Sequence, residues 1–123
     1  MFCTISPSSD NKYIILKYIG DVNRRDALMY TVESHTLGKK LNINRYLVDA
    51  TEAKHTDSVS DDYQFAYKDI PGADGIDFTA VVAVLANADD SSHDFIETVS
   101  RNSGLNVRLF KDRAKAVQYL VEE

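Results

Sequence analysis

The sequence is poor in the residues that mark secreted, nucleotide-binding and membrane-spanning proteins. Cys3 is its one cysteine, which excludes an internal disulfide and fits a reducing cytoplasm. Only five glycines are present, and no Gly-rich loop is available to wrap a nucleotide phosphate. No apolar run approaches the roughly 18 residues of a membrane-spanning helix, and no leader segment is visible. We therefore expect a cytoplasmic protein that inserts no helix into a membrane.

Positive charge is also scarce in this chain. There are 14 Lys and Arg residues against 19 Asp and Glu, so the formal net charge is −5 at pH 7. Because binding to phosphate backbones depends on clustered Lys and Arg, this balance disfavours nucleic acid as a partner. The hydrophobic share of 44% is nevertheless enough for a packed core, and a length of 123 residues suits a single domain over residues 1–123.

The segment Phe78–Ala86 contains the strongest structural signal. It carries no charge and does not alternate between apolar and polar residues, a pattern typical of a strand buried on both faces. Such a strand lies inside a largely parallel sheet that is covered by helices on both sides. The segment therefore predicts an α/β fold.

The other segments fit around this strand. Turn residues and periodicity predict five strands, at residues 2–5, 13–19, 45–49, 78–86 and 105–110. Capping residues and helical spacing predict about four helices, at residues 23–41, 58–70, 91–104 and from Asp112 onward. A short turn around Pro7 makes the first strand antiparallel to the second, and right-handed crossovers make the later strands parallel. The small side chains of Ser34 and Gly38 would let the first helix lie close to the sheet.

Four stretches in this order carry a resemblance to a known family. They are Ile19–Val22, Tyr46–Asp49, Thr56–Ser60 and the final strand–helix pair from Arg108 to Val117. Their order and spacing resemble the STAS superfamily, which includes the SpoIIAA-like anti-sigma-factor antagonists, over nearly the whole chain. The resemblance implies a single-domain STAS/SpoIIAA-like fold with a central, mostly parallel sheet of about five strands and about four helices. It also implies a bacterial-type regulator that acts by binding a protein.

The resemblance fails at the residue that the antagonists phosphorylate. Their third strand is followed by an Asp-Ser-Ser-Gly signature, in which the second serine is the switch. The matching residues here are Asp57, Ser58, Val59 and Ser60, so a valine stands at the phosphorylated position. We therefore expect no such switch. Phosphorylation of Ser58 or Ser60 is the alternative to Ser58 as a helix N-cap, and we favour the N-cap. The chain looks closer to the divergent branch that is grouped with lipid-binding Sec14-type (CRAL-TRIO) domains.

Two polar loops, residues 49–58 and 87–93, are expected at the carboxyl edge of the sheet, where open α/β sheets bind ligands. One interpretation makes the two histidines and several carboxylates of these loops a divalent-metal site or an acid–base pair, and an enzyme that uses Asp49, His55 or His93 would follow from it. The other makes the acidic and serine residues helix caps in solvated loops. We favour the second, and we predict no catalytic residue, no metal and no cofactor.

Isolated polar residues elsewhere are given no chemical role. We expect His35 to be at the surface or half-buried, and Cys3 to be inert packing. Arg24 and Arg25 oppose the dipole at the start of the first helix, which indicates either a partner carboxylate or nothing functional.

Tyr63, Phe65 and Tyr67 face more than one side of the predicted second helix. They either wrap over the sheet edge or form an exposed aromatic patch. We predict a non-enzymatic binding module whose interaction surface consists of six residues: Asp57, Ser58, Ser60, Tyr63, Phe65 and Tyr67. We expect its partner to be a protein, either a different one or a second copy in a homodimer. The alternative is a carrier of a lipid or other small apolar ligand, and a cavity of several hundred cubic ångströms under the second helix would favour it.

Overall fold

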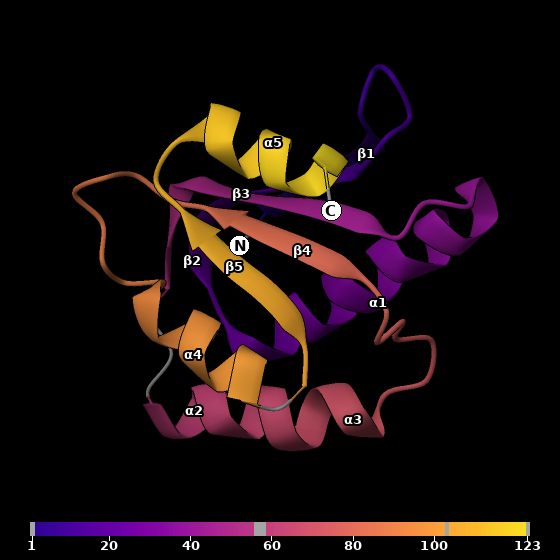
Figure 1. Ribbon diagram of the computed structural model, residues 1–123. Coiled ribbons are helices and arrows are strands. Elements are labelled where there is room, and N and C mark those ends of the chain that lie inside the picture. The colour runs from indigo at the N-terminus through magenta and orange to yellow at the C-terminus, as the bar shows by residue number, and fades with distance from the viewer. Residues whose placement is uncertain (1, 56–58, 103, 123) are drawn as a thin grey trace.

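The chain forms one five-stranded sheet with helices on both faces (Figure 1). The structure, a computed structural model, describes residues 2–55, 59–102 and 104–122, apart from the side chains of residues 55, 59, 62, 63, 66, 95, 96 and 99. The strands lie in the order of the chain: β1 (Phe2–Pro7), β2 (Ile14–Val22), β3 (Arg45–His55), β4 (Val81–Leu85) and β5 (Asn106–Phe110). β1 pairs antiparallel with β2, and the other pairs are parallel. The predicted α/β architecture is confirmed.

The helices divide unequally between the two faces of the sheet. In Figure 1, α5 (Arg113–Glu122) lies on one face, whereas α1 (Arg24–Leu41) and α4 (Asp94–Asn102) lie toward the other. Farther out on that second side is a continuous helical stretch, residues 59–72, which we call the second helical segment. It consists of α2 (Val59–Gln64), the π-helix η1 (Phe65–Asp69) and the short α3 (Ile70–Gly72).

The strand β4 is covered on both faces, as the apolar run predicts. Val81, Ala83 and Leu85 pack with Leu47, Ala116 and Leu120 in a core cluster beneath α5. Val82 and Val84 point to the opposite face and are half-buried. The predicted start of this strand is wrong: Phe78 is 48% exposed, and the carboxylate of Asp77 accepts hydrogen bonds from the amide and hydroxyl of Thr79, forming a turn before the strand.

Local signals place the ends of α1 correctly. The Asn23 side-chain oxygen accepts from the amide of Asp26 at 3.0 Å, which satisfies one of the free donors at the helix start. Near the other end, Gly38 lies so close to the sheet that an added Cβ would be 2.1 Å from the Tyr46 hydroxyl oxygen. The close approach predicted from Ser34 and Gly38 is confirmed, since both residues are buried.

Two predicted boundaries are wrong for tertiary reasons. β3 continues to His55, so residues 50–55 are strand and not loop, because they pair with the second half of β2. The pairing shifts by one residue between Lys17 and Ile19, which leaves an extra residue in β3, as in a β-bulge. The second helical segment continues through Pro71 to Gly72, two residues beyond the predicted end.

Candidate functional site

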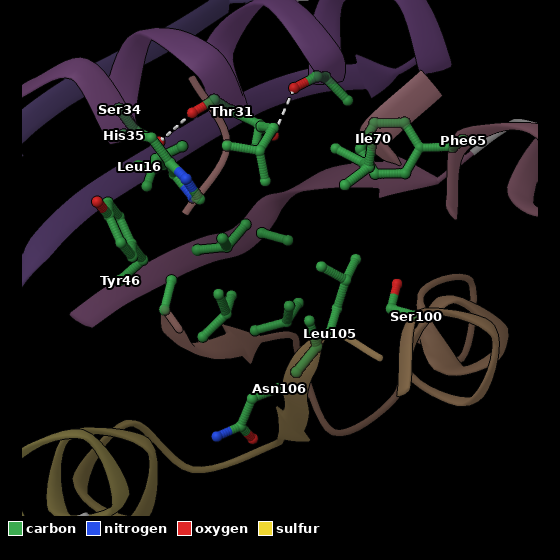
Figure 2. A pocket seen from close by; sticks show the side chains of 18 of the residues that line it. Leu16, Thr31, Ser34, His35, Tyr46, Phe65, Ile70, Ser100, Leu105 and Asn106 are labelled. Atoms are coloured by element: carbon green, nitrogen blue, oxygen red, sulfur yellow. Dashed lines mark hydrogen bonds between the residues drawn. The ribbon is translucent and has the colours of Figure 1, made fainter. Parts of the chain in front are cut away.

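A cavity of about 160 Å³ lies between the sheet and the helices on its second face. Its floor comes from β2 to β5, and its walls come from α1, the second helical segment and the α4–β5 connection, as Figure 2 shows. The lining is mainly apolar. Leu16, Val48 and Val82 contribute from the strands, and Phe65 and Ile70 contribute from the helical side.

The cavity exists because the second helical segment is held at a distance from the sheet. This segment contacts α1 through η1 and contacts α4 through α2, so it bridges two helices that lie between it and the strands. One tie is the guanidinium of Arg24, in the first turn of α1, which binds both carboxylate oxygens of Asp69, the Nη2–Oδ1 distance being 2.9 Å. This pair lowers the pKa of Asp69. A carboxylate partner, one of the two explanations for Arg24, is thus present within the chain.

Two aromatic residues of the predicted surface, Phe65 and Tyr67, lie in different environments on the π-helix. Phe65 lines the cavity, whereas Tyr67, two residues on, is 47% exposed. Short π-helical turns are rare and often occur at functional sites. Of the other predicted surface residues, Ser60 is exposed, Asp57 and Ser58 lie outside the described residues, and the side chain of Tyr63 is not described. That surface remains a prediction.

His35 is buried at the cavity wall, so the expectation of a surface or half-buried residue is wrong. Its side chain is 5% exposed, and its ring stacks on Tyr46 with centroids 4.6 Å apart. The ring Nδ1 accepts a hydrogen bond of 2.9 Å from the amide of Asp77. Burial lowers the pKa of His35, although the charge of Asp77 acts in the opposite direction. His35 follows Thr31 by four residues and precedes Gly38 by three, so its helix face was visible in the sequence.

The predicted polar neighbourhood at the carboxyl edge of the sheet is only partly assembled. A groove there is lined by Asp21, Lys54 and Asp90, among others, and the Nε2 of His93 lies 3.7 Å from the Asp90 carboxylate. The amide of Ser92 donates to Asp90 and, with Lys54, lowers the pKa of Asp90 to about 2. In the described part of the chain, no three His, Cys, Asp or Glu residues are placed to hold a metal ion.

Asp49 does not join that neighbourhood, contrary to the metal and acid–base interpretation. Its carboxylate pairs with Arg113, at the start of α5, and accepts from the amide and hydroxyl of Thr51. Burial alone would raise the pKa of Asp49, but the bonds from Thr51 and Arg113 outweigh it and lower that pKa. Asp49 therefore anchors α5 to the sheet. The side chain of His55 lies outside the described residues.

Cys3 packs against the core of the sheet face that α1 covers. Burial, assisted by the charge of Glu33, raises the pKa of the Cys3 thiol to about 11, so it is a weak nucleophile at neutral pH. In residues 2–55, 59–102 and 104–122, no helix is both long and apolar enough to cross a membrane.

Comparison with known proteins identifies the fold. No protein-family model and no curated protein matches the sequence. The structure is similar to that of an uncharacterised DUF3478-family protein with a SpoIIAA-like fold from Shewanella loihica PV-4. The two chains share 18% identity, the match covers 97% of this chain and 92% of the other, and the TM-score is 0.51. At this identity the likeness establishes the fold alone: the chain has a SpoIIAA-like fold, as the sequence resemblance predicts.

Proposed function

We propose that this chain is a non-enzymatic binding module that holds a small, mainly apolar molecule in the cavity between the sheet and the second helical segment. The observation that carries this proposal is the cavity of about 160 Å³ itself. An apolar cavity of about 150 Å³ in another protein stays dry and takes up benzene. The fitting ligand is therefore of benzene size or slightly larger, and a whole lipid chain is too large.

The energy of an empty cavity favours occupancy. Wall atoms that face a space without protein atoms lack van der Waals partners on that side. A ligand of matching shape would supply those contacts to the apolar lining. Phe65 and Ile70 stand on the outer wall, on the second helical segment, which contacts α1 and α4. Movement of this segment would give a ligand its route of entry.

The first test is a titration of the wild-type protein with benzene, followed by two-dimensional ¹H–¹⁵N NMR. We expect saturable shifts of the amides around the cavity. Val84→Phe, which fills the cavity from β4, should abolish them. Val121→Phe makes the same change at an exposed position of α5 and should leave them intact. Wild-type amides that do not respond up to the solubility limit of benzene would refute the proposal.

A second candidate function is regulatory binding of a protein partner, a second copy included, without a phosphoserine switch. The supporting observation is Tyr67, a large side chain left 47% exposed on the outer side of the second helical segment. Aromatic side chains of this kind often anchor protein interfaces. Native mass spectrometry measures the oligomer directly. Tyr67→Ala should shift a dimer toward monomer while the unfolding free energy stays within about 0.5 kcal/mol; an unchanged dimer fraction would exclude this surface as the dimer interface.

A further inference from the structure

His35 presents a hydrogen-bond donor to the cavity. Because its Nδ1 accepts from the amide of Asp77, the proton of the neutral ring is on Nε2. The neutral form is the one favoured at pH 7, since burial lowers the pKa of this residue. Figure 2 shows the His35 ring directed from α1 into the space between that helix and the strands.

The Nε2–H group has no hydrogen-bond acceptor among the described residues. The interactions of His35 are its bond with Asp77 and its ring stack on Tyr46. In the same described part of the chain, every fully enclosed side-chain nitrogen or oxygen has a partner. Nε2 is therefore not sealed inside the packed core. It borders open space, and the open space that His35 lines is the cavity.

The neighbouring hydroxyl groups of α1 and β3 direct their protons elsewhere. Ser34 donates to the backbone oxygen of Thr31 at 2.8 Å, and Thr31 donates to that of Ala27 at 2.7 Å. Tyr46 donates to the backbone oxygen of Ile43 at 3.4 Å. At this wall of the cavity, His35 is thus the side chain with a proton to offer a ligand.

We propose that the ligand has a neutral apolar body with one carbonyl oxygen, as in a small aromatic ketone or aldehyde, and that Nε2–H of His35 donates to this oxygen. The inference rests on the proposed function. A carbonyl has acceptor lone pairs and no proton, so a single donor satisfies it. A carboxylate would be buried without a free cation, because the guanidinium of Arg24 at the cavity edge is already bound to Asp69.

Two probes of nearly equal shape test this assignment. Acetophenone has the carbonyl, and ethylbenzene has a methylene group in its place. Each is titrated by NMR into the wild-type protein and into His35→Phe, which retains a ring to stack on Tyr46 and removes the donor. We expect the substitution to weaken acetophenone binding about tenfold and ethylbenzene binding less than about twofold.

The outcomes separate the two proposals. If His35→Phe changes the affinity for both probes by the same factor, the carbonyl assignment is wrong and the cavity still binds apolar molecules. If neither probe binds the wild-type protein, the proposed function fails, and this inference fails with it.

Side-chain ¹⁵N NMR of the wild-type protein tests whether Nε2–H of His35 donates to the ligand, even if the His35→Phe variant does not fold. The free protein should show a proton on Nε2 of His35 and none on Nδ1. Acetophenone should move the Nε2–H resonance downfield, and ethylbenzene should not. A proton on Nδ1, or an identical response to both probes, would overturn the assignment.

Discussion

Replacing Gly38 with alanine should destabilise the protein, although alanine is the better helix former. In an open helix this substitution stabilises by about 1 kcal/mol. At position 38, however, the new Cβ would lie 2.1 Å from the Tyr46 hydroxyl oxygen and 2.5 Å from the Ile43 carbonyl oxygen. Both distances are far below the roughly 3.5 Å of ordinary van der Waals contact.

Neither neighbour of Gly38 can move at little cost. Tyr46 is 2% exposed, stacks on His35 and donates to Ile43. The Ile43 oxygen belongs to the backbone at the end of α1, where it cannot rotate away. Overpacking of a core costs about 1–3 kcal/mol, and two clashes of this depth put Gly38→Ala near the upper value. After subtraction of the helix-propensity gain, we expect a net loss of about 2 kcal/mol in unfolding free energy.

Urea unfolding followed by far-ultraviolet circular dichroism measures this loss. Gly72→Ala is the matched control, because Gly72 is also helical and nothing lies within 4 Å of its added Cβ. That variant should be as stable as the wild type within about 0.5 kcal/mol, or slightly more stable. A Gly38→Ala protein at least as stable as the wild type would show that α1 does not approach Tyr46 as closely as described, and the geometry of the cavity wall would have to be revised.

Two further predictions concern the cavity walls. Arg24→Gln removes the ion pair with Asp69 and should speed amide hydrogen exchange in the second helical segment. Because this pair is partly exposed, the free energy of unfolding should fall by no more than about 1 kcal/mol. Unchanged exchange would mean that the pair does not hold the segment. The pKa of His35 is lowered by burial, with Lys39 adding to the effect and Asp77 opposing it, so the unfolded chain binds more protons than the folded one in mildly acidic solution. The unfolding free energy from urea titrations should therefore be level between about pH 7 and 8 and fall as the pH drops from about 6.5 toward the lower folded pKa. His35→Phe should flatten this slope, and an equal slope in both proteins would contradict the assignment to His35.

Local sequence signals were sufficient for the order and type of the elements. The apolar run that contains β4 identifies a strand buried on both faces, and its residues do pack on both. Side-chain caps are also local: Asn23 accepts from the amide at the start of α1, and Asp112 accepts from the amide of Ala114 at the start of α5. These interactions join residues two or three positions apart, so a single sequence contains them in full.

The second half of β3 could not be predicted in this way. Residues 50–55 have the composition of a polar loop with two alanines, and they form a strand because the end of β2 supplies a parallel partner. The bulge that permits this pairing is accompanied by bonds from Thr51 to the carboxylate of Asp49. Strand formation here depends on tertiary pairing, which overrides weak intrinsic preference.

The sequence does not predict the cavity either, because the cavity depends on the distance between the sheet and the helices that cover it. Nothing in the identities of Leu16 or Val82 distinguishes the lining of a void from the interior of a packed core. Two unusual features of the sequence did indicate part of the cavity wall. Arg24 stands where a helix disfavours a cation, and its partner Asp69 belongs to the segment that forms the outer wall. Phe65 and Tyr67 are two residues apart, which on a helix directs them to different sides.

The π-helix η1 contains a residue for each of the two candidate functions. Phe65 faces the cavity and Tyr67 faces outward, with one residue between them. A ligand that contacts Phe65 can bias the surface around Tyr67 only by the difference between its affinities for two arrangements of the segment. A molecule that fills only the strand side of the cavity would bind equally to both arrangements and transmit nothing. Coupling between an inner ligand and an outer partner therefore requires contact with the wall formed by residues 65–70, whatever the total affinity of the ligand.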